Sequence, residues 1–443
     1  MRRAFIFVTI FVFVICSANV YAGTARTAAP FLSSDGGTRA AGMPDAFTAV
    51  SGDIISAFWN PGGLASISER QATIAYSNVS AMFGDASEGM YYALMAFAMP
   101  VSDIGVFGTT LQLYGQGTTV KTRAVLVCSS IATAKGIHHY VFFNRDRERI
   151  SEHGFLETSA FEGAQLKYTW KELEPEKDNY NFSIIQSDLD FLTSKEKKLF
   201  IQLQDVSFDI SIINVPQYLC EDNNYNGGVA KQYRYEGNDE KNAVPEGWVA
   251  RRWDPAVQKR FQKLLFALGK EFDGKIEGIN LPETSVEFGE SGWLFPKGFT
   301  FDVYKNAIIS NMKALKRAFP KSVTMQYANF MPGEWLPWKN ESYLSSVYQS
   351  AQELKVGVGG PDLLPYRKGQ MNHSYQFIRQ SDGIVPTGIA VQWGNYEYTN
   401  PKTGKQVTVQ ELLEFGRDYL KVDYIFWCPQ EPYYSERLIP FLQ

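Results

Sequence analysis

Short apolar runs and longer amphipathic stretches alternate eight times over the C-terminal two thirds of the chain. Between the runs, apolar residues recur at helical spacing, most clearly over 255–272, 302–319, 341–354 and 409–420. Asp254 and Pro255 are typical of a helix start. The runs themselves have the length and composition of strands and cover 138–144, 163–170, 198–204, 276–283, 322–330, 356–362, 387–393 and 424–429.

This alternation predicts parallel strands joined by right-handed crossovers. Eight such units within residues 135–443 fit an α/β fold of the (β/α)8 type, a TIM barrel, which needs about 250 residues plus insertions. The stretch from Asp205 to Trp253, rich in Asn, Gly and Tyr, is then an insertion after the third strand. A doubly wound open sheet is the alternative, although no Gly-rich phosphate loop follows the first strand.

The N-terminal quarter has a different pattern, with three predicted strands at 70–79, 90–99 and 104–115. In the third run, apolar residues at 107, 111 and 113 share one face, and small or polar residues at 108, 110 and 112 share the other. Such alternation over about ten residues is typical of a strand that faces lipid in an outer-membrane barrel. The edge of a soluble sheet is the alternative interpretation.

The first 22 residues predict a secretory signal peptide. Arg2 and Arg3 precede an apolar run that ends at Cys16, and Ala22 provides a small residue for cleavage. The run is short for a membrane span, and the bulky Ile15 disfavours lipidation of Cys16. We therefore expect an exported protein, located in the periplasm, in the outer membrane or outside the cell.

The density of charged residues also divides the chain into two parts. Residues 23–120 contain three Arg, no Lys and seven acidic residues, and charged residues become much denser from Lys121 onward. Residues 121–134 read as an internal signal-like remnant or, equally, as a buried strand or helix. We predict a signal peptide at 1–22, a truncated β-barrel-like segment at 23–120, a junction at 121–134 and the barrel at 135–443. The join is either a fusion of two exported proteins or an assembly error.

The net charge and the numbers of Cys and His residues exclude some classes of protein. With 43 basic and 47 acidic residues, a net charge of −4 and no basic block, the chain does not resemble a nucleic-acid binder. Four Cys without a close pair and four His argue against a zinc module or a disulfide framework. We expect no metal and no cofactor. Cleavage after Ala22 would leave three cysteines, so at least one thiol stays free.

The N-terminal quarter resembles a family of membrane proteins. GTRAAGMPDAFTAV, followed by FWNPGGL, is similar to the start of PorV-type outer-membrane barrels, relatives of fatty-acid transport barrels, with Pro44 and Gly62 departing from the family pattern. The resemblance implies outer-membrane association in a Gram-negative-type bacterium. Three strands cannot close a barrel, and an open one would expose backbone groups to lipid. This segment is therefore a remnant or a strand donor, and an outer-membrane transport fragment is one alternative function.

In a (β/α)8 barrel, the active site lies at the C-terminal ends of the strands. Indole faces stack on sugar rings, and amides and carboxylates bind hydroxyl groups. The side chains at the predicted strand ends therefore indicate an oligosaccharide or polysaccharide as the ligand. For Trp170 and Trp427 a place in the core is the alternative, but it is less attractive because both residues end strands at the same rim. The predicted substrate-binding set is Trp170, Gln204, Asp205, Asn329, Gln392, Trp393 and Trp427.

Glu283 is the leading candidate for a catalytic residue. Pro282 cannot extend a strand ladder, so the fourth strand ends here and presents the carboxylate at the rim. A salt-bridge partner or helix cap is the alternative role. We interpret Glu174 as structural, and Glu287 and Glu290 can line the cleft.

Part of the predicted barrel also resembles a known clan. GAQLKYTWKELEPEKDNYNFSIIQSDLDFL, KLFIQLQ and VPQYL are similar to the second and third units of retaining (β/α)8 glycoside hydrolases, such as bacterial β-galactosidases and cellulases. The resemblance implies that Glu283 is the general acid/base, although Pro282 stands where the clan has Asn. The clan's nucleophile, a Glu that ends strand seven, falls on Gln392, which is followed by Trp393 and Gly394.

Gln392 leaves the second carboxylate open, because retention needs two carboxyl groups about 5 Å apart. Glu431, just beyond strand eight, can supply one. Asp362 or Asp205 can serve as the base of an inverting reaction, in which the gap is about 6.5–9.5 Å. Otherwise the barrel binds sugar without cleaving it. We predict an exported glycoside hydrolase-like protein, with a non-catalytic saccharide-binding protein as the alternative.

Overall fold

The computed structural model describes residues 52–56, 60–67, 69–78, 91–101, 105–116, 122–132, 136–235, 237 and 239–443. The chain divides into two compact units, Met1–Lys135 and Gly136–Gln443. The predicted signal peptide and the Gly-rich stretch up to residue 51 lie outside the described residues. Within the described part, none of the helices has the length and apolar character needed to cross a membrane.

The described part of the first unit contains a 3-10 helix, η3 (Pro61–Ser66), and a four-stranded antiparallel sheet. Three of its strands lie within two residues of the predicted ranges, and the fourth occupies most of the predicted junction. Leu94, Ala96 and Val106 are buried in a small core of their own. The resemblance to PorV-type barrels stays a prediction. The strands are β1 (Gln71–Asn78), β2 (Tyr91–Val101), β3 (Gly105–Gln116) and β4 (Thr122–Ala132).

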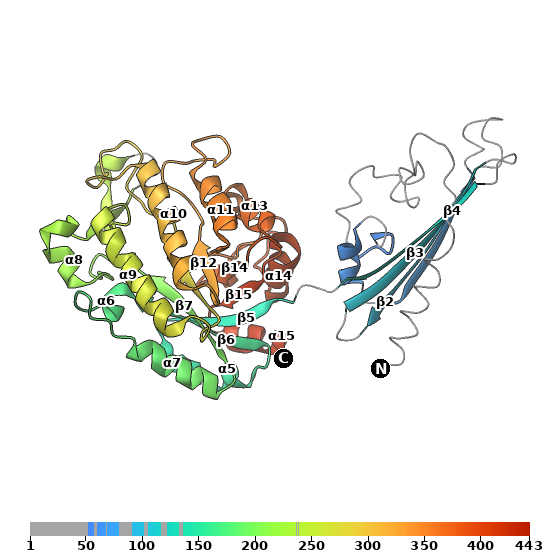
Figure 1. Cartoon of the computed structure of the whole chain (residues 1–443), viewed down its shortest axis with the longest axis horizontal. Helices are drawn as coiled ribbons and strands as arrows, with labels where there is room; N and C mark the ends of the chain where they lie inside the picture. The colour runs from blue at the N-terminus through green and yellow to red at the C-terminus, as the bar shows by residue number, and fades with distance from the viewer. Residues whose placement is uncertain are drawn as a thin grey trace. The chain divides into compact units, whose positions relative to one another are not determined.

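The second unit is a closed barrel of eight parallel strands (Figure 1). The last strand pairs with the first, with Phe426 opposite Tyr140, so no strand edge is left open. The predicted (β/α)8 fold is therefore confirmed, and the open sheet is excluded. In chain order the strands are β5 (His138–Asn144), β6 (Phe161–Thr169), β7 (Lys198–Gln204), β11 (Gly278–Leu281), β12 (Val323–Tyr327), β13 (Gly357–Gly360), β14 (Thr387–Val391) and β15 (Tyr424–Trp427).

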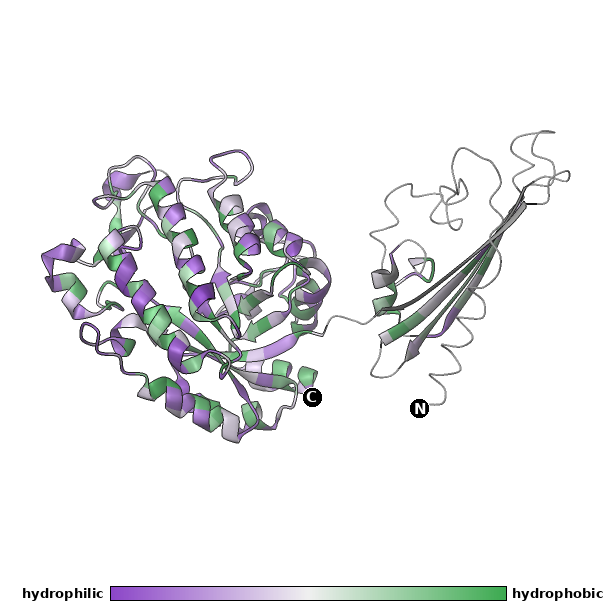
Figure 2. Cartoon of the chain, viewed as in Figure 1, coloured by the Kyte–Doolittle hydropathy of each residue, from purple (hydrophilic) through white to green (hydrophobic). Residues whose placement is uncertain are grey.

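Helices surround the strands, as Figure 1 shows. Hydrophilic and hydrophobic residues alternate along the long helices α9 (Pro255–Phe272) and α10 (Phe301–Ala318), as expected for helices with one buried face (Figure 2). The side chain of Asp254 accepts hydrogen bonds from the N–H groups of Ala256 and Val257, which confirms the predicted helix start.

The other helices of the barrel unit are shorter. The regular ones are α5 (His153–Glu157), α6 (Trp170–Leu173), α7 (Ser183–Ser194), α11 (Tyr343–Leu354), α12 (Lys368–Asn372), α13 (Ser374–Gln380), α14 (Val409–Glu414) and α15 (Ile439–Leu442). The 3-10 turns are η5 (Arg147–Ser151) and η8 (Asn395–Glu397), and the π-helical turns are η9 (Phe415–Leu420) and η10 (Tyr434–Leu438).

The predicted insertion after the third barrel strand forms a small antiparallel sheet of its own, with the order β8-β10-β9. A Cβ atom at Gly247 would lie 1.9 Å from the Ser207 carbonyl oxygen, so only glycine permits this pairing. Because the insertion begins directly after β7, it lies at the carboxyl ends of the strands. Its elements are β8 (Val206–Ser207), α8 (Gln217–Glu221), η6 (Asn223–Tyr225), β9 (Val229–Arg234), η7 (Glu240–Asn242) and β10 (Val244–Ala250).

Two separate hydrophobic clusters fill the barrel unit. Tyr140, Phe200, Met325 and Phe426 belong to a cluster of inward-facing side chains within the barrel. A much larger cluster, which includes Trp427, lies between the strands and the helices. Since side chains alternate along a strand, a shift of one position transfers a residue from one cluster to the other.

Candidate active site

Glu283 follows β11, the fourth strand of the barrel, at the carboxyl-end rim. It is half-buried, and its Oε2 accepts a hydrogen bond of 2.6 Å from Nδ2 of Asn329, which follows β12. Burial raises the pKa of Glu283, and the charge of Asp362 raises it further, whereas the hydrogen bond from Asn329 and the charges of Lys167 and Arg252 lower it.

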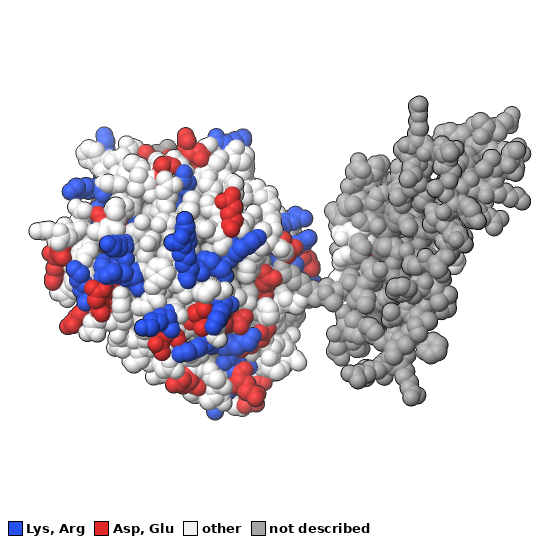
Figure 3. All heavy atoms as spheres, viewed as in Figure 1, with Lys and Arg blue, Asp and Glu red and all other residues white. Residues whose placement is uncertain are grey.

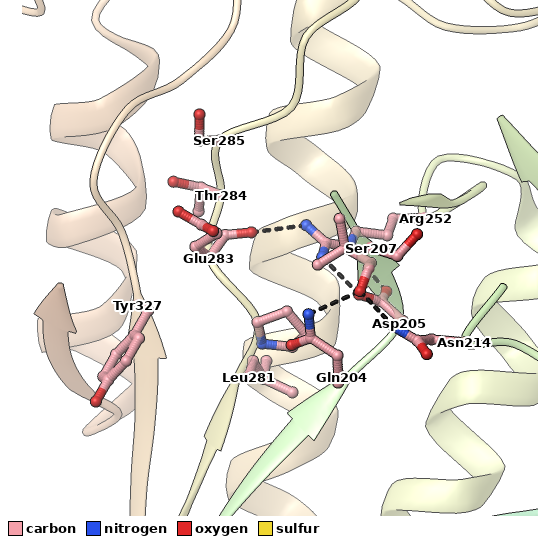
Figure 4. A network of polar contacts seen from close by, with 12 residues as sticks. Gln204, Asp205, Ser207, Asn214, Arg252, Leu281, Glu283, Thr284, Ser285 and Tyr327 are labelled. Atoms are coloured by element: carbon pink, nitrogen blue, oxygen red, sulfur yellow. Dashed lines mark hydrogen bonds and ion pairs between the residues drawn. The ribbon is translucent and has the colours of Figure 1, made fainter. Parts of the chain in front are cut away.

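The backbone around Glu283 is held by buried side chains (Figure 4). Arg252 Nη1 donates to the carbonyl oxygen of Glu283 at 2.8 Å and to Tyr304 Oη at 2.9 Å. Tyr304 Oη in turn donates to the Thr284 carbonyl at 2.9 Å. These contacts fix the direction in which the Glu283 side chain leaves the chain.

Asp205 forms a buried ion pair with Arg252. Its two carboxylate oxygens accept hydrogen bonds from Arg252, 2.9 Å from Nε and 2.6 Å from Nη2, and both residues are buried. Asp205 is 2% exposed, so water and substrate do not reach its carboxylate, which is held by the bidentate ion pair. The predicted roles of Asp205 are therefore corrected to a structural one. Gln204 is also buried, and its Nε2 donates to the Val206 carbonyl at 2.7 Å.

Asp362 provides the second acidic side chain of the rim. It follows β13, is half-buried, and accepts a hydrogen bond of 3.2 Å from Asn395 Nδ2. Asn395 Oδ1 accepts from the N–H groups of Gln392 at 2.9 Å and Leu363 at 3.3 Å. Burial raises the pKa of Asp362, against the opposing effects of Asn395 and Arg367. Asn395, which the sequence did not single out, thus links the ends of β13 and β14.

Glu283 and Asp362 share an electrostatic environment. Both pKa values are raised, chiefly by burial, and the charge of Asp362 contributes to the pKa of Glu283. A negative charge on one carboxyl group disfavours ionisation of a second one nearby. One acid and one base on the same rim is the arrangement that general acid–base chemistry requires.

Lys167, on β6, is a rim residue that sequence reasoning missed. It shares a strand face with Gln165, whose amide donates to Asn280 and Tyr327 inside the barrel. Its Nζ lies 5.4 Å from the Phe142 ring centroid, and no hydrogen bond or ion pair joins it to another described residue. Burial, with the charge of Arg145, lowers the pKa of Lys167 to about 8. A lysine at an inward position of a buried strand is the signal that would have found it, since an enclosed cation is costly.

Trp170 and Trp427 are fully buried in the cluster between strands and helices. The indole N–H of Trp170 donates to Glu174 Oε2 at 2.8 Å, and that of Trp427 to His139 Nδ1 at 3.0 Å. Neither indole face is open to a sugar ring, so the substrate-binding prediction for both is corrected in favour of the core alternative. Glu174, which pairs with Arg260, is buried as a structural residue would be.

The remaining predicted residues lie in different settings. Glu431 is exposed, and its Oε2 accepts hydrogen bonds from the side-chain hydroxyl and the backbone N–H of Ser435, so its predicted catalytic role stays a prediction. Gln392 is half-buried at the end of β14. Trp393, next to it, is 73% exposed. Asn329 contacts Glu283 directly, as described above.

Exposed indole rings occur on the loops that follow the barrel strands. Trp293 is 76% exposed in the β11–α10 loop, Trp335 and Trp338 are 78% and 48% exposed in the β12–α11 loop, and Trp393 follows β14. Sequence reasoning identified Trp393 alone, because it considered strand ends and not whole loops. Exposed aromatic rings on rim loops are suited to stacking against a ligand.

Charge over the rest of the barrel unit is mixed. In the view of Figure 3, basic and acidic side chains are interspersed over its surface.

Among the described residues, His, Cys, Asp and Glu form no group of three or more that could hold a metal ion.

Comparisons with family models and with curated proteins find no match. Among solved structures, the chain resembles xylanase 10B from Thermotoga petrophila RKU-1, at 13% identity and a TM-score of 0.36 over 66% of this chain and 82% of that one. It also resembles an exo-β-1,4-mannosidase from Opitutaceae bacterium strain TAV5, at 10% identity and a TM-score of 0.37 over 68% of this chain and 55% of that one.

A third similar structure is the β-galactosidase from Bacillus circulans sp. alkalophilus, at 9% identity and a TM-score of 0.44 over 66% of this chain and 50% of that one. The chain thus spans about half the length of the mannosidase and the galactosidase. At such identities and TM-scores, these likenesses add nothing to what the strand pairing already shows about the fold.

Proposed function

We propose that this protein is an O-glycosyl hydrolase that acts on a saccharide, with Glu283 as the general acid and Asp362 as the general base. The observation that carries the proposal is the pair of half-buried rim carboxyl groups, each bound by one amide side chain and each with a raised pKa. The exposed indoles of the rim loops support a saccharide as the ligand.

In the proposed reaction, protonated Glu283 gives its proton to the glycosidic oxygen as the bond from that oxygen to the anomeric carbon breaks. Ionised Asp362 takes a proton from the water whose oxygen bonds to the same carbon. The amide at Gln392 cannot form a glycosyl-enzyme bond as a carboxylate does, so the proposed outcome is inversion. Burial suits Glu283 to this role, because a raised pKa keeps the acid protonated at higher pH.

The test is a screen of aryl-glycosides and of plant and algal polysaccharides with wild type, Glu283→Gln and Asp362→Asn. Each variant is expected to lower kcat by about 10²–10⁴-fold on the substrate that wild type cleaves, while binding persists. Glu353→Gln, an exposed residue of α11 that pairs with Gln349, is the matched control. NMR of the first-formed product anomer is expected to show inversion. Unchanged turnover in Glu283→Gln would remove Glu283 as the acid.

The alternative is a saccharide-binding protein without catalysis. It is favoured by one specific observation, the uncharged Gln392 at the end of the seventh barrel strand. Glycan binding by wild type without turnover of any substrate would support this alternative. Gain of a retaining activity in Gln392→Glu would then indicate that only the nucleophile is missing.

We also propose that the protein is exported, with residues 1–22 removed, and that its first unit associates with an outer membrane. Ile74 and Tyr76 of β1 and Met95 and Phe97 of β2 are exposed, which would suit contact with lipid. A mature N-terminus at Gly23 and recovery in the outer-membrane fraction are the expected results. Heat-modifiable migration would favour the outer-membrane transport alternative. Sequencing codons 110 to 140 in independent isolates tests whether the join at 121–134 is genuine.

A further inference from the structure

A groove of about 1050 Å³ lies between the insertion and the loop that follows β11. The insertion contributes Phe208 and Tyr235, the β11–α10 loop contributes Ser285 and Glu287, and the β12–α11 loop contributes Trp335. This volume is at the upper end of the ~300–1,000 Å³ typical of small-molecule sites, so the groove has room for more than a single sugar residue.

The two walls of the groove are bound to each other. Tyr235 Oη donates to Glu287 Oε1 at 2.7 Å. Glu240 of the insertion accepts hydrogen bonds from the N–H groups of Glu290 at 2.7 Å and Ser291 at 2.9 Å, and from Ser291 Oγ at 2.5 Å. Because groups of the protein itself join the two walls, binding of a ligand does not have to order them.

The groove begins beside the proposed acid. Ser285, which lines it, lies two residues after Glu283 on the same loop (Figure 4). The N–H of Ser285 donates to Asn329 Oδ1 at 3.3 Å, and Asn329 Nδ2 donates to Glu283 at 2.6 Å. The Asn329 side chain therefore links a residue that lines the groove to the proposed acid.

The lining combines flat apolar rings with carboxylates. Trp335 is 78% exposed and Phe208 is 57% exposed, which leaves their rings open to a ligand. Among the described residues, four glutamates and one arginine, Arg234, line the same groove. Aromatic faces stack on sugar rings, and carboxylates accept hydrogen bonds from hydroxyl groups. The excess of negative charge disfavours polyanionic chains.

We propose that this groove binds further residues of an uncharged polysaccharide whose reacting residue lies at Glu283, so that the protein acts on long chains in preference to short ones. The inference rests on the proposed function and extends it, because it assigns the substrate class and gives the insertion after β7 a role. The bound polysaccharide would extend from Glu283 past Ser285 and then between Phe208 and Trp335.

The test compares β-1,4-linked gluco-, xylo- and manno-oligosaccharides of two and six residues. The measured quantity is kcat/KM where wild type cleaves the series and Kd by calorimetry where it only binds it. Wild type is expected to prefer the hexamer at least ten-fold. Trp335→Ala and Phe208→Ala are each expected to remove most of this preference while the dimer values stay unchanged. Phe266→Ala is the matched control, since Phe266 is an aromatic residue that is 46% exposed on α9 and does not line the groove.

The groove inference alone fails if wild type handles dimer and hexamer alike, or if Phe266→Ala has the same effect as Trp335→Ala. It also fails if polygalacturonate binds more tightly than the uncharged hexamer. Absence of both binding and cleavage for every saccharide would overturn the proposed function together with the inference. Thermal melting of each variant distinguishes a lost contact from a lost fold.

Discussion

Among individual side chains, Glu283 and Asp362 are the ones whose surroundings oppose their charge. Each is half-buried behind a single amide donor, and burial is the main cause of each raised pKa. A carboxyl group with a raised pKa stabilises the folded state at low pH, and this stabilisation is lost as the pH rises through the folded-state pKa. The proposed catalytic groups should therefore lower the stability of the protein at neutral pH.

We predict that Glu283→Gln is more stable than wild type at pH 7. The neutral amide has no charge to desolvate, whereas Glu283 is ionised above its folded-state pKa. The advantage should shrink as the pH falls and vanish below 4.5, the ordinary value of the group, where wild type is protonated in both states. Urea unfolding of both proteins between pH 3 and pH 8 measures it. An advantage that stays constant over this range would contradict the burial argument.

Lys167 should set the upper pH limit of activity. Its charge lowers the pKa of Glu283, so Lys167→Met should raise that pKa and move the alkaline limb of the pH–kcat profile to higher pH. Lys313→Met, an exposed position on α10, serves as the control and should leave the limb in place. A shift to lower pH, or no shift, in Lys167→Met would contradict this effect of Lys167 on Glu283.

Among strands and loops, the most consequential link joins the insertion to the loop that carries Glu283. Arg252, just after β10, binds Asp205 at the end of β7 and the carbonyl of Glu283 after β11. One guanidinium therefore sets the relative positions of two strand ends and one inserted segment.

Breaking this ion pair should destabilise the barrel unit strongly. Asp205→Ala leaves the buried Arg252 without its carboxylate and is expected to cost about 3–5 kcal/mol. The double variant Asp205→Leu/Arg252→Met should recover much of that stability but not the activity, because the Glu283 carbonyl still loses its donor. Denaturant unfolding with parallel kinetics measures both effects.

The exposed pair of Arg417 and Asp418 provides the comparison for this experiment. Arg417→Ala is expected to cost no more than about 1 kcal/mol, since exposed ion pairs contribute little. A loss for Asp205→Ala as small as that for Arg417→Ala would show that the buried pair does not hold the loop.

For the chain as a whole, closure of the barrel has a direct consequence. β15 pairs with β5, so the strands from Gly136 onward need no partner from the first unit. We predict that residues 136–443 alone fold cooperatively and retain the saccharide activity or binding of the full chain within about two-fold. Circular dichroism, calorimetry and the kinetic screen, each applied to residues 136–443 and to the full chain, check this prediction. An unfolded or aggregated fragment would contradict it.

Local patterns were enough to predict the barrel. The strands 138–144 and 198–204 and the helix 255–272 coincide with β5, β7 and α9, because periods of two and 3.6 residues are written in neighbouring positions. Strand order also follows from sequence, since short right-handed crossovers leave few topologies. The rim position of Glu283 after the fourth strand follows from the same pattern.

The composition of the site depends on contacts between distant segments, which no local pattern encodes. β12 pairs with both β11 and β13 and places their ends on one rim, where the charge of Asp362 raises the pKa of Glu283, while Arg252 pairs with Asp205. A difference of one position along β15 turns Trp427 toward the helices while Phe426 faces the barrel interior. Strand ends can be located from sequence only to within a residue or two. Because side chains alternate between the two faces of a strand, an error of one residue assigns a side chain to the wrong face. For that reason the fold followed from local periodicity, whereas the choice of partners for each carboxyl and indole group required the packed molecule.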